Sequence, residues 1–150
     1  MNRKGFIGGS DAVKIMRGEW LELWKIKTGR IEPDNLDHVL PVQIGILTED
    51  LNLSWFEREE DNFITHKQLK IKKDLDGVPI KGTIAGKTLL STSAEADNCY
   101  LSVIFGNLKW DWTKIPYDES YIATLLDMIK EFWGYIERDE EPDINRGEGL

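Results

Sequence analysis

Apolar residues recur every three or four positions in three stretches of the chain, the period that predicts an α-helix. The first helix is expected over residues 10–28. Ser10 is a good N-cap for it, and Gly29 follows its last turn. Gly18 is a candidate break that would divide this stretch into two helices.

The second helix is expected over residues 40–59, where Pro41 suits the first turn. Its apolar residues cover two adjoining faces, which predicts a helix buried at the centre of the fold. The third helix is expected over residues 118–137, with Asp118 as its cap and a broad apolar face.

Between the second and third helices apolar and polar residues alternate, the period of a β-strand. Candidate strands cover residues 63–71, 78–84, 88–92, 100–105 and 108–113. The segment Asp74-Leu75-Asp76-Gly77 is expected to be a hairpin turn, because Asp-Gly is typical of a two-residue loop.

This order of elements predicts an α+β fold. We expect a mostly antiparallel sheet of four to five strands, flanked by two N-terminal helices and one C-terminal helix. A chain of 150 residues predicts a single domain over residues 1–150. Its acidic tail, about residues 138–150, is expected to fray.

The composition, 41% hydrophobic and 31% charged, is that of a globular protein. Six Trp residues should anchor a core or an interface. The net charge of −8 counts against tight nonspecific DNA binding, although a local basic groove is compatible with it.

Cys99 is the only cysteine, so the chain can form no intramolecular disulfide and no thiolate zinc site. We expect it to be a small buried core residue. No apolar run reaches the length of a membrane span, and the N-terminus lacks a signal peptide. A cytoplasmic protein without membrane contact is therefore expected.

The N-terminal segment Arg3 to Ser10 carries residues suited to an anion. Gly8 and Gly9 allow the backbone to approach a phosphate closely, and Ser10 opens a helix whose free N–H groups favour negative charge. Arg3 can make a bidentate phosphate contact. The alternative is an ordinary N-cap that follows a flexible terminus.

Two further segments bear on a metal site. Glu49 falls on an apolar face of the second helix, where a carboxylate requires a metal ion or a neighbouring amide, Lys or Arg. Residues 81–93 are expected to form two short strands around a turn bracketed by Gly82 and Gly86. His38 and His66 lack metal-ligand partners at short spacing and are expected at the surface or in caps.

These motifs together resemble the YqaJ-like viral recombinases and phage lambda exonuclease, which have a restriction-endonuclease-like, PD-(D/E)XK fold. The resemblance implies that Arg3 and Ser10 stand where the family binds the terminal 5′-phosphate of DNA. It implies that Glu49 is the first acid of the family's metal site. It also implies that Ala85, Ser91 and Ser93 replace an Asp, a Glu and a Lys of that site. Glu49, Ala85, Ser91 and Ser93 would then be vestigial positions of a lost catalytic site.

The late strands and last helix also resemble the family, but two of its helices are missing between Ser93 and Tyr100. Active members use Mg²⁺ or Mn²⁺, whereas no cofactor is expected for this chain. The leading hypothesis is a catalytically inactive, shortened homologue of a phage-type DNA exonuclease that retains DNA-end binding. Such a protein would bind DNA through Arg3 and Ser10, together with lysines on the sheet: Lys70, Lys72 and Lys81.

Two alternatives remain open. One is a protein-interaction or oligomeric scaffold module without DNA binding, in which Trp110, Trp112 and Trp133 contribute to an interface; the family forms rings. The other is a weak metal-dependent DNA nuclease in which Glu49, with Asp76 or Glu95, holds a metal ion. DNA ends and further copies of the chain are thus the expected partners.

Overall fold

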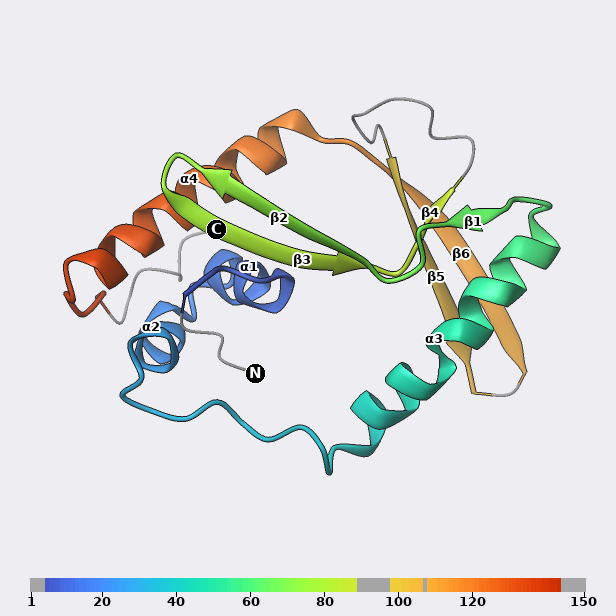
Figure 1. Cartoon of the computed structure of the whole chain (residues 1–150), viewed down its shortest axis with the longest axis horizontal. Coiled ribbons are helices and arrows are strands. Elements are labelled where there is room, and N and C mark those ends of the chain that lie inside the picture. Colours follow the sequence, from blue (N-terminus) through green and yellow to red (C-terminus); the bar gives the residue numbers. More distant parts are fainter. Residues whose placement is uncertain (1–4, 89–97, 107, 144–150) are drawn as a thin grey trace. The chain divides into compact units, whose positions relative to one another are not determined.

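The computed structural model describes residues 5–88, 98–106 and 108–143, and it confirms a mixed α+β fold (Figure 1). The elements in chain order are α1 (Gly9–Met16), α2 (Trp20–Thr28), α3 (Leu40–Glu59), β1 (Ile64–Thr65), β2 (Leu69–Leu75), β3 (Val78–Ile84), β4 (Lys87–Thr88), β5 (Asn98–Phe105), β6 (Lys109–Pro116) and α4 (Glu119–Glu137).

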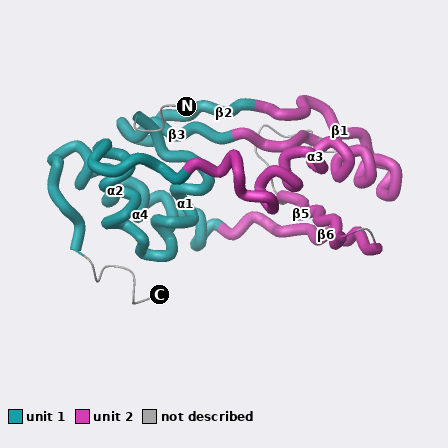
Figure 2. The backbone as a smooth tube through the Cα atoms, turned by 90° about the horizontal axis from the view of Figure 1, so that it is seen from below, with its two compact units in different colours: residues 1–34, 70–82, 119–150 teal, residues 35–69, 83–118 magenta. Residues whose placement is uncertain are grey.

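The strands do not form the single sheet of four to five strands that the sequence predicted. The described residues form three two-stranded sheets, β1 with β4, β2 with β3, and β5 with β6. The chain divides into two compact units, shown in different colours in Figure 2. Unit 1 comprises residues 1–34, 70–82 and 119–150, and unit 2 comprises residues 35–69 and 83–118. Within the described ranges, no helix is both long enough and apolar enough to span a membrane.

Unit 1 packs α1, α2 and α4 with the β2–β3 hairpin around one hydrophobic core. The buried members of this core are Ile7, Ile15, Trp20, Leu23, Trp24, Val78, Ile129 and Phe132. Trp20 meets Phe132 edge to face, with ring centroids 5.7 Å apart, and its indole N–H donates to the Ile15 carbonyl at 2.8 Å. The prediction that Trp residues anchor a core is therefore confirmed for Trp20 and Trp24.

Glycine in the left-handed region ends both N-terminal helices. Gly18, with φ of 74°, separates α1 from α2, and Gly29, with φ of 81°, follows α2, as predicted. The predicted N-cap at Ser10 was wrong, because α1 begins at Gly9 and Gly8 is its N-cap. Asp11, three residues after Gly8, accepts the Gly8 N–H at 2.7 Å and so takes the capping role that Ser10 was assigned.

A buried ion pair lies between α1 and α2. Lys27 Nζ is 2.6 Å from the Asp11 carboxylate, and the two side chains are only 1% and 9% exposed. The same ammonium donates to the Phe6 carbonyl at 2.7 Å. Both charges are thus paired, and the segment before α1 is tied to α2.

The β2–β3 hairpin confirms the predicted Asp-Gly turn. Asp76 and Gly77 have φ of 51° and 91°, the positive values that a two-residue type I′ loop requires, and the Gly77 N–H donates to Asp74 at 2.8 Å. Lys130 on α4 pairs with the Asp76 carboxylate and holds the pKa of Asp76 below its usual value.

The prediction of a frayed tail over residues 138–150 was wrong for its first part. Pro142 is fully buried, and Arg30 on the segment after α2 forms an ion pair with Asp139 at 2.8 Å. Residues 144–150 lie outside the described part of the chain.

Unit 2 places α3 against one face of the β5–β6 ribbon (Figure 1). Phe56 is buried and contacts the rings of Tyr100, Trp110 and Trp112, with centroid distances between 5.6 and 6.3 Å. Asn52 on α3 adds a polar network, since its amide donates to the Ser102 carbonyl at 2.8 Å. The Asn52 side-chain oxygen also accepts from the Ser102 hydroxyl at 2.7 Å.

The carboxylate of Glu57 fastens the end of α3 to β1. It accepts the Ile64 backbone N–H at 2.9 Å and the Lys67 ammonium at 3.2 Å. These two donors, the backbone N–H first, hold the pKa of Glu57 below its usual value.

Two burial predictions in unit 2 were wrong. The bounds predicted for α3 are correct, but Phe56 is its only buried residue, so α3 is not a buried central helix. It meets the ribbon on one side only, and its adjoining apolar face is exposed. Cys99 is exposed rather than buried, because it lies on the side of β5 that alternates away from Tyr100 and α3. His38 and His66 are exposed, as predicted.

We predict that Lys27→Met lowers the free energy of unfolding by about 3–5 kcal/mol, because it leaves a buried Asp11 carboxylate without its cation. Urea denaturation followed by tryptophan fluorescence measures this loss. Lys14→Ala is the control, since Lys14 pairs with Glu22 near the surface and its loss should cost less than about 1 kcal/mol. Similar losses for the two variants would show that the Lys27 pair has no special role.

A second prediction concerns the hairpin. Gly77→Ala should destabilise the protein by about 1–2 kcal/mol, because alanine is strained at a φ of 91°. Gly82→Ala, in β3, meets no atom within 4 Å and should change stability by less than about 0.5 kcal/mol. Thermal unfolding of both variants tests this, and an unchanged Gly77→Ala midpoint would contradict the turn assignment.

Candidate functional site

The N-terminal turn, residues 6–10, is held against β3 before α1 begins. Ile7 forms a parallel bridge with Ile80, donating its N–H to the Pro79 carbonyl at 2.9 Å and accepting the Lys81 N–H at 3.0 Å. The Ile7 side chain is buried in the unit 1 core. With Lys27 bound to the Phe6 carbonyl, the turn is fixed from two sides.

Gly9 leaves the backbone of this turn open. A Cβ atom at Gly9 would meet nothing within 4 Å, and both Gly9 and Ser10 are exposed. A Cβ atom at Gly8 would lie 3.3 Å from the Asp11 carboxylate and 3.8 Å from the Lys81 carbonyl. Gly9 and Ser10 are therefore accessible at the N-terminus of α1, where an anion is favoured, whereas Gly8 is half-buried and its N–H is bound to Asp11.

The cationic side chain of Lys81 on β3 adjoins this turn, and β2 carries two further lysines. The Lys81 ammonium lies 4.4 Å from the centroid of the Phe6 ring, and Lys81 is exposed. A two-residue loop at Asp76-Gly77 places Lys72 opposite Lys81 across the hairpin. Lys70 shares that face with Lys72, because side chains two residues apart point to the same side of a strand.

Like charges directly opposite each other destabilise a strand pair, so Lys72 and Lys81 favour a bound anion between or above them. Asp11 does not oppose this charge, because its carboxylate is paired with Lys27 and the Gly8 N–H. The structure thus places the Lys81 backbone next to Gly8 and the Lys81 ammonium over the Phe6 ring, in the turn that leads to Gly9 and Ser10. Arg3 lies outside the described residues.

Sequence reasoning missed the roles of Asp11 and Lys27. Lys27 follows Trp20, Leu23 and Trp24 at the spacing of one helix face, so it occupies a position where an apolar residue is expected. A lysine at such a position indicates a buried cation that requires a partner. Asp11 gave the second signal, as an acid in the first turn of the predicted helix.

The positions implied for the metal site are only partly described. Glu49 is half-buried on α3, and Ala85 lies in the bend after β3, where its carbonyl accepts the Gln68 N–H at 2.9 Å. Ser91 and Ser93 lie outside the described residues, as does Glu95. Glu49 belongs to unit 2, whereas Asp76 belongs to unit 1 and is paired with Lys130.

The segment 81–93 differs from its prediction as far as it is described. Gly82 lies within β3 rather than at a turn, and the strands on either side of Ala85 are not partners, since β3 pairs with β2 and β4 with β1. A Cβ atom at Gly86 would lie 2.1 Å from the Ile64 side chain, so the close approach of β1 requires glycine there. Among the described residues, no group of three or more His, Cys, Asp or Glu side chains could hold a metal ion.

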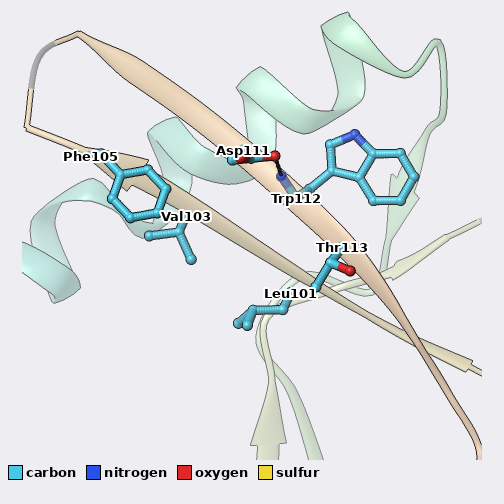
Figure 3. Close-up of a pocket in the computed structure, with 6 residues that line it drawn as sticks. All are labelled: Leu101, Val103, Phe105, Asp111, Trp112 and Thr113. Carbon is cyan, nitrogen blue, oxygen red and sulfur yellow. Dashed lines mark hydrogen bonds between the residues drawn. The ribbon is translucent and has the colours of Figure 1, made fainter.

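A shallow groove lies on the face of the β5–β6 ribbon that carries Leu101, Val103 and Phe105 (Figure 3). Its volume is about 230 Å³, and its lining is completed by Asp111, Trp112 and Thr113. The Asp111 carboxylate accepts hydrogen bonds from the Lys109 ammonium and from the Trp112 backbone N–H. Both bonds lower the pKa of Asp111, and the bond with Lys109 has the larger effect. The groove therefore offers mainly apolar contact.

Trp110 and Trp112 are half-buried through their contacts with Phe56, so much of their surface is used within unit 2. The Trp112 indole donates to Glu60, and the Trp110 indole donates to the Ser102 hydroxyl. Trp133 on α4 is half-buried against the unit 1 core and donates to Glu137.

Comparison with known proteins returned no match: no protein-family model, no curated protein and no solved structure is significantly similar to this chain.

Proposed function

We propose that this protein is a catalytically inactive, shortened relative of phage-type DNA exonucleases that binds the 5′-phosphate at DNA ends through its N-terminal turn. The observation that carries the proposal is the position of Lys81 beside a fixed turn whose backbone is open at Gly9 and Ser10. A terminal phosphate would accept hydrogen bonds from the backbone and Ser10 and an ionic contact from Lys81.

The proposed loss of catalysis rests on side-chain chemistry. Two-metal hydrolysis of a phosphodiester needs several carboxylates around the ions. By the resemblance to the exonucleases, Ala85, Ser91 and Ser93 replace an Asp, a Glu and a Lys, and Glu49 alone is a poor ligand set for Mg²⁺. End binding requires none of those groups.

The net charge of −8 limits how the protein can bind DNA. A protein with this charge is repelled by a DNA duplex at long range, so affinity must come from a few local contacts. Those contacts, at Lys81 and Lys72, would make the affinity fall as salt rises, and the 5′-phosphate would be preferred over an internal phosphate.

A protein-interaction or scaffold role is the second candidate, and the exposed apolar residues of α3 favour it. Leu47 is 80% exposed, and Ile44 and Leu51, one turn before and after it on α3, are about half exposed. Exposed apolar side chains gathered on one element commonly mark an interface between proteins. This role does not exclude end binding, because the two features lie in different units.

We predict that the protein binds a 5′-phosphorylated duplex more tightly than the same duplex with a 5′-hydroxyl, as measured by fluorescence anisotropy at low salt. Lys81→Ala and Arg3→Ala should each reduce this preference about tenfold, equivalent to about 1.4 kcal/mol. Lys14→Ala, which removes a lysine that pairs with Glu22, should leave it unchanged. Equal affinity for both duplexes would contradict the proposed site.

A further prediction concerns catalysis. A 5′-phosphorylated duplex incubated with the protein and Mn²⁺ should remain full length on a denaturing gel, as it does with EDTA. Shortened strands only with Mn²⁺ would contradict the inactive assignment. If Glu49→Gln then abolished the degradation, Glu49 would be a ligand in a weak metal-dependent nuclease.

A further inference from the structure

The N-terminal part of α3 carries an exposed apolar stripe. Leu40, Ile44, Leu47 and Leu51 follow one another at spacings of four, three and four, so they lie on one face of the helix. Their exposed fractions are 68%, 49%, 80% and 53%. This spacing is that of the contact seam between two paired helices.

Within unit 2, α3 uses a different face to meet the β5–β6 ribbon. Phe56 packs against Tyr100 and Trp112, and Asn52 bonds to Ser102. Glu49 and Val42, which share the Phe56 face, are half-buried. The stripe therefore adds little to the packing of α3 on the ribbon and is available to another helix.

The charges along α3 are arranged unevenly. Residues 39–48 contain no charged side chain, and acidic residues begin at Glu49 and Asp50. The N-cap residue, Val39, makes no side-chain capping bond, and the first turn holds no acid. The helix thus has an uncompensated positive end and, two to three turns later, an exposed carboxylate at Asp50, directly before Leu51 of the stripe.

We infer that the stripe pairs with the same stripe of a second copy of this chain, with the two α3 helices antiparallel. In this arrangement Leu40 lies opposite the partner subunit's Leu51, and Ile44 lies opposite the partner subunit's Leu47. Asp50 then lies level with Pro41 in the first turn of the partner helix, where a carboxylate is favoured. The pairing is isologous and closes at a dimer.

The charge pattern selects this occupant and this direction. In a parallel pair the two Asp50 carboxylates would face each other, and both uncapped helix ends would lie together. An anionic membrane would be repelled by Asp50, Glu57 and the acidic residues that follow α3. In the antiparallel pair the uncharged halves of α3 come together, so two strongly acidic chains can meet without opposing their carboxylates.

Four side chains per copy make a small contact, and interfaces at the low end of the size range are transient. The dimer should therefore form with a dissociation constant in the micromolar range. Sedimentation velocity of the full chain between about 5 and 200 µM, without DNA, should show the monomer converting to a dimer as concentration rises.

Leu47→Glu tests the stripe, because Leu47 is largely exposed and its replacement leaves the unit 2 packing intact. We expect a monomer at every concentration, with circular dichroism and thermal midpoint unchanged. Leu108→Glu, at a residue 92% exposed outside the stripe, is the matched control and should keep the dimer. The inference would be overturned if the wild-type chain remained monomeric at 200 µM or formed a trimer. It would also be overturned if the Leu47→Glu variant dimerised as well as the wild type.

The direction of pairing is tested by cross-linking in a Cys99→Ser background. Leu40→Cys and Leu51→Cys chains, when mixed, should form a mixed disulfide dimer under mild oxidation, whereas Leu40→Cys alone should not cross-link efficiently. Efficient cross-linking of Leu40→Cys with itself would overturn the antiparallel arrangement. Leu47→Glu should still prefer a 5′-phosphorylated duplex, so failure of the dimer and failure of end binding are distinguishable.

Discussion

The buried ion pair between Lys27 and Asp11 is the interaction on which the N-terminal part of unit 1 depends. It joins α2 to α1, and through the Phe6 carbonyl it also positions the turn that precedes α1. Asp11 in turn caps α1 by accepting the Gly8 N–H. Two desolvated charges are costly unless each is satisfied, so this geometry leaves the turn few alternatives. The exposed backbone at Gly9 and Ser10 is thus held in place by the contacts of Phe6, Ile7 and Gly8.

Unit 2 is organised by aromatic contacts and one polar network. Phe56 contacts three aromatic rings of the ribbon, and Asn52 on the same helix forms hydrogen bonds with Ser102 of β5. This packing uses one face of α3 and one face of the ribbon. It leaves apolar residues exposed on the other face of each, at Leu47 and at Leu101, for example. Because Phe56 is the one buried residue of α3, most of the apolar surface of this helix is exposed and could contact a partner protein.

The two proposals divide between the two units. End binding would use backbone groups and lysines in unit 1, where the chain has local positive charge despite its acidic composition. Dimerisation would use the uncharged, apolar half of α3 in unit 2. A dimer of end-binding chains would present two phosphate sites, and binding two DNA ends at once raises the effective affinity for each. Neither role requires the carboxylates of a metal site.

The sequence alone determined most of the helix bounds and the hairpin turn, because 3.6-residue periodicity, Gly18, Gly29 and the Asp76-Gly77 turn act through local backbone geometry. It missed the start of α1, whose N-cap is Gly8. It also identified the glycine turn as a candidate anion site. Tertiary structure alone decided what each apolar face contacts: α3 lies at the surface, and the strands in the described part of the chain form three pairs rather than one sheet. The pairing of Lys27 with Asp11 was likewise decided by tertiary structure. Such contacts join residues far apart in the chain, and periodicity carries no information about which face meets which partner.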